Sequence, residues 1–146
     1  MKLLFTSIGR RVELIQAFKS AAERSMVDLY IVGGDVSNTA PALHFCDEAV
    51  TLPLIKSNDY IPFLIDYCNK NHIDALIPTI DTDLLPLAEY KEDFGHTKVI
   101  VSSPEMIRIC RDKRLTADSF AGLGLNCPAP VDDIKKYAGP FPAFIK

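Results

Sequence analysis

Short apolar runs recur along the chain, separated by longer segments with a different pattern. The runs lie at residues 3–6, 29–32, 48–52, 75–78 and 99–101. Short runs with few charged residues are typical of strands buried on both faces of a parallel sheet. The pattern therefore predicts five strands, of which the third is the weakest. A turn at Gly33-Gly34-Asp35 is predicted to end the second strand.

The intervening segments place apolar residues three and four positions apart, which is the spacing of one buried helix face. Leu14, Ile15 and Phe18 form one such stripe. Predicted helices begin near Arg11, after Ser57 or Asn58, near Thr82 or Asp83 and after Ser103, and a last one covers residues 115–123. In the third of these helices we place Pro86 in the first turn and Gly95 at the end.

Alternating strands and helices predict an α/β fold, with a doubly wound parallel sheet of about five strands and right-handed crossovers. Ligands bind such sheets beyond the carboxyl ends of the strands, where the strand order reverses. That rule selects three loops, at residues 6–11, 33–38 and 79–83. We expect all three loops to lie together at one edge of the sheet.

The first loop, Ser7-Ile8-Gly9-Arg10-Arg11, precedes a helix N-terminus, where backbone N–H groups attract anions. Its two guanidinium groups suit a carboxylate or a phosphate. A single glycine does not make the Gly-x-Gly-x-x-Gly fingerprint of dinucleotide sites. Two interpretations stay open: an anion site, or a turn made by Gly9 whose arginines pair with surface acids.

Acidic residues follow two other strands. Asp35 ends the second strand, where an acid binds ribose hydroxyls in dinucleotide folds, although turn propensities favour a simple turn residue there. Thr79-Ile80-Asp81-Thr82-Asp83 brings two carboxylates and two hydroxyls ahead of a helix. We expect one carboxylate to cap that helix and the other to face the crevice, where it would hold a substrate amine.

The composition narrows the range of partners. The 146 residues are 48% hydrophobic and 24% charged, with a net charge of −3. These values exclude a disordered chain and disfavour non-specific binding to nucleic acid or an anionic membrane. No apolar run approaches the ~18–20 residues that span a bilayer. We therefore expect a cytoplasmic protein that binds a small molecule.

The sequence offers no familiar catalytic or metal motif. The four cysteines form no Cys-x-x-Cys pair and no cluster with zinc spacing, so we expect reduced, buried thiols and no metal site. Cys68 and Cys110 fall on apolar stripes. A Ser/His/Asp or Cys/His arrangement and a Walker A loop are also absent from the sequence.

Four stretches, in this order, resemble the N-terminal part of ATP-grasp proteins, in the branch similar to the large subunit of carbamoyl-phosphate synthase. They are residues 6–14, residues 78–83, Ser102-Ser103-Pro104-Glu105 followed by Asp112-Lys113, and Phe141-Pro142-Ala143-Phe144-Ile145-Lys146. The resemblance implies a Rossmann-like pre-ATP-grasp domain over residues 1–126. Residues 127–146 would form a linker and the first strand of a truncated ATP-grasp domain.

The resemblance also implies a chemistry. Such enzymes phosphorylate a carboxylate with ATP and Mg2+, and an amine or another nucleophile then attacks the acyl phosphate. Lys113 matches the family's Asp-Lys motif and Lys146 its first grasp strand, so both would contact ATP phosphates. The loops on the substrate side would contribute Ser7, Gly9, Arg10, Arg11, Asp35, Thr79, Asp81 and Asp83.

The chain also departs from this family. The Gly-rich flexible loop, the adenine-holding strand and the magnesium ligands would all lie beyond Lys146. We therefore expect a fragment that has no catalytic residue of its own, is inactive alone, binds no cofactor tightly and works with the missing ATP-grasp domain. A homodimer stays open, as do carbamoyl phosphate or an amino-acid or peptide bond as the product. A stand-alone NAD-binding domain and a non-catalytic interaction module are the rival interpretations.

Overall fold

The computed structural model describes residues 1–127, 131, 133, 135 and 137–139. The chain divides into two compact units, Met1–Ile107 and Arg108–Lys146. The strand predicted near the end of the chain, with Lys146, lies outside the described residues.

The first unit is built on a five-stranded sheet in which every strand pair is parallel. Its strands are β1 (Lys2–Thr6), β2 (Tyr30–Asp35), β3 (Glu48–Thr51), β4 (Ala75–Pro78) and β5 (Lys98–Val99). The order across the sheet is β3-β2-β1-β4-β5. The chain therefore runs outward from β1 to β3 and returns to the other side of β1. The predicted doubly wound α/β sheet is confirmed, and its strand order reverses between β1 and β4.

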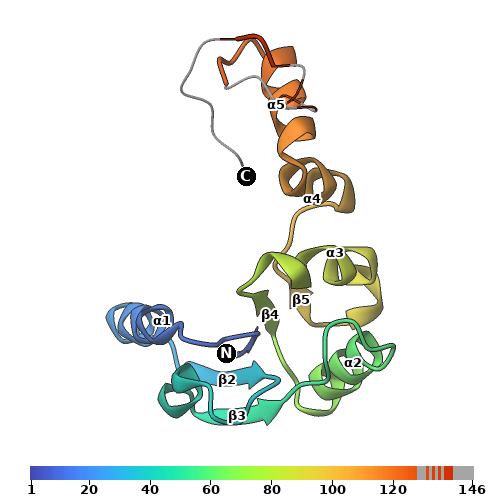
Figure 1. Ribbon diagram of the computed structural model, residues 1–146. Coiled ribbons are helices and arrows are strands. Elements are labelled where there is room, and N and C mark those ends of the chain that lie inside the picture. Colours follow the sequence, from blue (N-terminus) through green and yellow to red (C-terminus); the bar gives the residue numbers. More distant parts are fainter. Residues whose placement is uncertain (128–130, 132, 134, 136, 140–146) are drawn as a thin grey trace. The chain divides into compact units, whose positions relative to one another are not determined.

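Helices cover both faces of this sheet (Figure 1). One face carries α1 (Val12–Arg24) and a short 3-10 helix, η1 (Pro41–Phe45). The other carries α2 (Tyr60–Lys70), α3 (Asp81–Glu89) and a second 3-10 helix, η2 (Lys91–Phe94). Because β1 lies in the middle of the sheet, its side chains alternate between the two cores.

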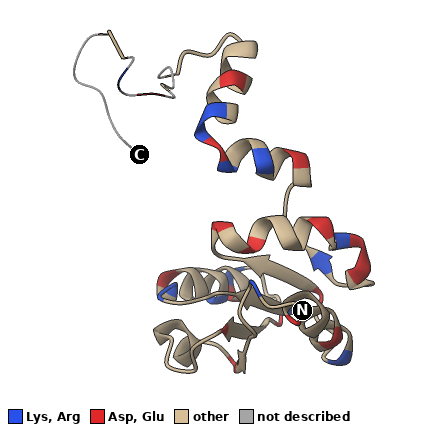
Figure 2. Cartoon of the chain, turned by 45° about the vertical axis from the view of Figure 1, so that its right-hand side comes forward, with Lys and Arg blue, Asp and Glu red and all other residues tan. Residues whose placement is uncertain are grey.

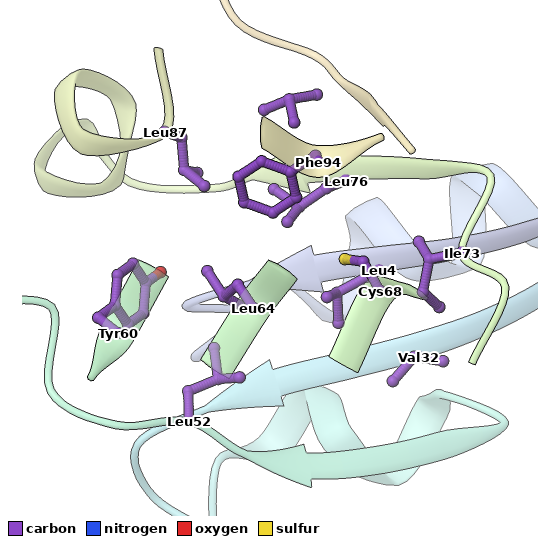
Figure 3. Packing of buried hydrophobic residues seen from close by; sticks show 11 residues of the cluster. Leu4, Val32, Leu52, Tyr60, Leu64, Cys68, Ile73, Leu76, Leu87 and Phe94 are labelled. Carbon is purple, nitrogen blue, oxygen red and sulfur yellow. The ribbon is translucent and has the colours of Figure 1, made fainter. Parts of the chain in front are cut away.

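The alternation is visible in consecutive residues of β1. Leu4 packs with α2 and α3, whereas Leu3 and Phe5 pack with α1 and η1. On the α2 side, Tyr60, Leu64 and Cys68 follow one another at every fourth position along the buried face of the helix (Figure 3). Figure 2 shows that charged residues of both signs occur along the helices, while the middle of the sheet is almost entirely uncharged. Both faces of the middle strand β1 are therefore buried, as its apolar run predicted.

The predicted turn after the second strand is wrong. Gly33, Gly34 and Asp35 continue β2 and pair in register with residues of β3. A Cβ atom on Gly33 would lie 2.6 Å from the Cys46 Sγ and 3.0 Å from a methyl group of Leu43. Gly33 is therefore needed because η1 and the segment after it approach the strand closely, and not because the chain turns.

The third helix also differs from its prediction. Its N-cap is Ile80, in extended conformation and without a side-chain capping bond, so neither carboxylate caps it as predicted. Pro86 is the sixth residue of α3 and lies inside the helix, not in its first turn. Gly95 does not end α3; it follows η2 with a φ of +61°. The unpredicted η2 supplies the buried Phe94 to the α2-side core.

Two helices follow the sheet, α4 (Pro104–Arg111) and α5 (Lys113–Gly122). Ser103 begins the first of them as predicted, since its Oγ accepts the N–H of Met106 at 3.2 Å. Asp112 stands at the break between them and caps α5 by accepting the N–H of Arg114 at 2.9 Å. The Arg114 guanidinium, and to a lesser extent that backbone bond, lower the pKa of Asp112 to about 2.

The cysteines only partly follow the prediction of buried thiols. Cys68 is buried, Cys46 and Cys127 are half-buried, and Cys110 is exposed. Burial raises the pKa of the Cys68 thiol to about 12 and that of Cys46 to about 11, so both stay protonated near neutral pH. No helix in the described part of the chain is long and apolar enough to span a membrane.

Candidate functional site

The three loops selected from the sequence meet at the carboxyl ends of β1, β2 and β4. The Gly9 N–H donates to the Asp35 Oδ2 at 2.8 Å, which joins the first loop to the second. The Arg11 Nη2 donates to the Thr79 carbonyl at 3.0 Å, which joins the first loop to the third. The prediction that these loops share one edge of the sheet is confirmed, and the edge lies where the strand order reverses.

The first loop is held in an unusual backbone conformation. Ser7 has a φ of +53° and Gly9 a φ of +49°, both in the left-handed region. For serine this region is disfavoured, and such strain collects where the surrounding structure enforces a functional geometry. The enforcing contacts are the Thr79 Oγ1, which donates to the Ser7 carbonyl at 2.6 Å, and the Ile8 N–H, which donates to the Gly34 carbonyl at 3.1 Å.

The Asp35 carboxylate accepts hydrogen bonds from the backbone of the protein itself. Asp35 is 8% exposed, and its two oxygens accept the N–H groups of Gly9 at 2.8 Å and of Ser37 at 3.0 Å. These bonds fix the ends of two loops to the tip of β2. The observed contacts agree with the turn interpretation of Asp35; a contact with a ribose or a substrate stays a prediction.

The two acids at the start of α3 differ completely in exposure. Asp81 is exposed, whereas Asp83 is 0% exposed and its Oδ2 accepts a hydrogen bond from the Thr6 Oγ1 at 2.8 Å. Burial raises the pKa of Asp83, and the nearby charge of Asp35 acts in the same direction. The observed contacts of Asp83 are internal, so its predicted contact with substrate stays a prediction.

Tyr60 belongs to the same buried region, and the sequence analysis did not single it out. It is the first residue of α2 and is 1% exposed. Burial, together with the charge of Asp83, raises the pKa of its hydroxyl. The sequence signal that could have identified Tyr60 is its spacing, because it lies four residues before Leu64 and extends the buried face of α2 by one turn (Figure 3).

Three charged side chains remain on the surface of this edge. Arg10, Arg11 and Asp81 are exposed. One N–H group of Arg11 donates to the Thr79 carbonyl. The side chains of Arg10 and Asp81 make no hydrogen bond or ion pair with the residues that the structure describes. The edge therefore offers a guanidinium and a carboxylate to a solute. Surface hollows of about 380 and 250 Å³ lie elsewhere, along β5 and η2 around Lys91, Lys98 and Val99.

The residues predicted to contact ATP are only partly described. Lys113 is the first residue of α5 and is exposed, and its Nζ lies 3.5 Å from the Cys110 carbonyl. Its ammonium group is thus accessible to a phosphate, while Lys146 lies outside the described residues. The described part of the chain holds no group of three His, Cys, Asp or Glu residues arranged for a metal ion. ATP contacts stay predictions for both lysines.

The five-stranded parallel sheet with flanking helices matches the fold of the N-terminal domains of ATP-grasp enzymes. Residues 3–102 match the family described as the PylC-like N-terminal domain. The chain belongs to this family. Among curated proteins, none matches the sequence.

Solved structures share the fold at low sequence identity. The L-amino acid ligase from Bacillus licheniformis has a TM-score of 0.62 and 17% identity, over 87% of this chain and 31% of its own. The glycinamide-RNase-transformylase T from Mycobacterium tuberculosis has a TM-score of 0.61 and 15% identity, over 86% and 35%. The N5-carboxyaminoimidazole synthetase from Staphylococcus aureus, complexed with ADP, has a TM-score of 0.59 and 11% identity, over 84% and 30%. The matched part of this chain thus spans about a third of the length of each of these proteins.

Proposed function

We propose that this chain is the substrate-side N-terminal domain of an ATP-grasp carboxylate–amine ligase similar to the large subunit of carbamoyl-phosphate synthase. The observation that carries the proposal is the family match over residues 3–102. The matched segment contains the three loops at the carboxyl ends of β1, β2 and β4, with the exposed Arg10, Arg11 and Asp81, which we refer to as the charged edge. In such a ligase ATP, bound with Mg2+, supplies the phosphoryl group that activates a carboxylate. The catalytic part would come from the ATP-grasp domain of the same protein.

The charged edge supports a binding role for this domain. Arg10 and Arg11 carry planar guanidinium groups, which bind carboxylates and phosphates through paired N–H donors. Asp81 lies in the first turn of α3 and would hold an ammonium group. Ser7, Gly9, Asp35, Thr79 and Asp83 would shape the edge through the backbone and side-chain bonds described above.

Amino-acid or peptide ligation suits this edge better than synthesis of carbamoyl phosphate. An amino acid carries both a carboxylate and an amine, and the edge presents unpaired groups of both signs in Arg10 and Asp81. The rival interpretation as an NAD-binding domain finds less support, because Asp35 is occupied by the backbone of Gly9 and Ser37. No feature of the described residues favours a non-catalytic interaction module.

The lysines complete the proposal on the ATP side. Lys113 and Lys146 would neutralise phosphate charge with ammonium groups, and charge-assisted bonds of this kind contribute on the order of 1.5–3 kcal/mol each. The exposed position of Lys113 at the N-terminus of α5 supports this role, since backbone N–H groups there also favour anions.

Replacing Lys113 by alanine should weaken ATP binding by about tenfold or more in the ligase that contains this domain, since one charge-assisted contact is lost. Calorimetric titration with ATP measures the effect. The melting temperature without nucleotide should stay nearly unchanged, because Lys113 makes no ion pair with the described residues.

Lys56→Ala is the matched control, because Lys56 is also exposed and lies in the first unit, outside the motifs of the resemblance. It should leave ATP affinity unchanged. An unaltered ATP affinity in Lys113→Ala would remove this residue from the ATP site and weaken the proposed function.

A further inference from the structure

Three polar side chains from different elements meet beneath the first loop. Thr6 ends β1, Tyr60 begins α2 and Asp83 lies in the first turn of α3. All three are at most 1% exposed, and the Thr6 Oγ1 donates to the Asp83 Oδ2 at 2.8 Å. We refer to Thr6, Tyr60 and Asp83 as the buried polar cluster. None of its members contacts solvent, although each can form hydrogen bonds.

The cluster contains two polar atoms without a hydrogen-bond partner among the described residues, the Tyr60 Oη and the Asp83 Oδ1. Buried polar groups are almost always paired, so two such atoms in one cluster need an explanation. An ionised Asp83 would offer only acceptors. The Tyr60 hydroxyl can donate to such a carboxylate, but ionisation would leave a buried negative charge that forms no ion pair with the described residues. A proton on the carboxyl group removes that charge and still allows hydrogen bonds with the Thr6 and Tyr60 hydroxyls.

The charges around the cluster favour that proton. Burial is the largest influence and raises the pKa of Asp83, while the neighbouring hydroxyl groups of Thr6, Ser7 and Tyr60 lower it by lesser amounts. Asp35, at the tip of β2, adds a negative charge that raises the pKa further. In the segment before α1, the Arg11 guanidinium donates to the Thr79 carbonyl and forms no ion pair with Asp83. On α3 itself, the remaining acid of the first turn, Asp81, is exposed.

The cluster is connected to the loop through the backbone. Thr6 directly precedes Ser7, and the Thr79 Oγ1 lies 3.0 Å from the Thr6 carbonyl and 2.6 Å from the Ser7 carbonyl. Thr79 in turn comes shortly before α3, which carries Asp83. Any shift of Asp83 against Thr6 therefore acts on the left-handed Ser7 and on the position of Arg10 beyond it.

We propose that Thr6, Tyr60 and Asp83 form a proton-binding cluster that holds the loop of residues 7–11 in its ligand-binding conformation, so that ligand affinity at this edge depends on pH. Loss of the proton to solvent leaves a buried negative charge, which attracts the Thr6 hydroxyl more strongly and so changes the Thr6–Asp83 contact. The predicted pH dependence of ligand affinity rests on the proposed function. The effect of the proton on the loop can be observed without any ligand.

The direction of the pH effect follows from the raised pKa of Asp83. A group whose pKa is higher in the folded than in the unfolded state stabilises the fold below its unfolded pKa. That stabilisation is lost as the pH rises through the folded pKa. The free energy of unfolding should therefore fall over this interval in the natural chain, and this fall should be missing from Asp83→Asn, which stays neutral.

The test is a pH titration of the isotope-labelled 146-residue chain by NMR. The Asp83 carboxyl carbon should titrate above the ordinary range of aspartate, and the amides of Ser7, Ile8, Gly9 and Arg10 should follow the same midpoint. Asp83→Asn should abolish this shared transition. Asp66→Asn is the control, since Asp66 is exposed and, among the described residues, pairs with Lys70 alone, and it should leave the transition unchanged.

Tyr60→Phe is the second variant. It removes a hydroxyl that lacks a partner, so the chain should fold, and it should move the Asp83 midpoint upward because the carboxylate loses a stabilising neighbour. An Asp83 midpoint in the ordinary range, an unmoved midpoint in Tyr60→Phe, or loop amides that do not follow Asp83 would each overturn the proposal. A normal loop transition without any binding of carboxylates would instead contradict the proposed function alone.

Discussion

Replacing Leu76 by alanine is expected to lower the free energy of unfolding by about 2–5 kcal/mol. Leu76 lies in β4, is 0% exposed, and pairs in register with Leu4 on one side and Val99 on the other. It belongs to the core on the α2 side of the sheet, where Leu64, Leu87 and Phe94 surround it (Figure 3). Truncation leaves a cavity that these neighbours cannot fill without moving the sheet or the helices.

Urea unfolding followed by far-ultraviolet circular dichroism measures this loss. Leu54→Ala makes the same chemical change at a residue that is 68% exposed, and it should alter the free energy of unfolding by less than about 0.5 kcal/mol. Equal effects of the two substitutions would contradict the burial of Leu76 in the core between β1 and β5.

The second large effect is expected for Gly33→Ala, at about 1–3 kcal/mol of destabilisation. Its new Cβ atom would meet the Cys46 Sγ at 2.6 Å and the Cys46 Cβ at 3.3 Å. Neither the strand nor the segment after η1 can retreat freely, because β2 is paired on both sides. The overlap must therefore be relieved by a backbone shift.

Cys46→Ala provides the test of this cause, since it removes the sulfur atom that the new methyl group meets. Urea unfolding should show that Gly33→Ala lowers the free energy of unfolding clearly less in the Cys46→Ala background than in the natural chain. Identical costs in both backgrounds would show that the destabilisation arises from strand conformation, and would contradict the close approach of Cys46 to β2.

The succession of elements could be predicted because its signals are local. The apolar run at residues 75–78 has the same bounds as β4, and the run at 3–6 differs from β1 by one residue. Ser103 and the proline after it marked a helix start that the structure reproduces. Topological rules then placed three loops at one edge, which the bonds of Gly9 to Asp35 and of Arg11 to Thr79 confirm.

Other features depend on contacts that no local pattern shows. Gly33 and Gly34 have the composition of a turn, yet they lie in β2 because Cys46, Leu43 and Leu52 pack against them. The acids at positions 81 and 83 look alike in sequence. The partner that decides between them is Thr6, 77 residues away from Asp83. Such choices are made by tertiary packing, which overrides local propensity.

The site residues also divide into those that the sequence identified and those that only the folded structure shows. Arg10, Arg11 and Asp81 were identified by residue type and loop position, and the structure places them exposed at the predicted edge. Tyr60 was not predicted as a site residue, because the sequence pattern of an aromatic residue at the start of a helix indicates only a buried core position. Only the folded chain shows that its hydroxyl shares a buried region with Asp83.

The central claim is that the edge formed by β1, β2 and β4 binds a small carboxylate. The most direct measurement is the titration of the 15N-labelled chain with glycine, which carries a carboxylate and an ammonium group, followed through its amide NMR signals. We expect millimolar binding, as a few kcal/mol allow, with shifts at Gly9, Arg10, Ser37 and Asp81 that Arg10→Ala abolishes. Unchanged signals at these residues, together with shifts at the same residues on addition of NAD, would contradict the account and identify a dinucleotide-binding domain.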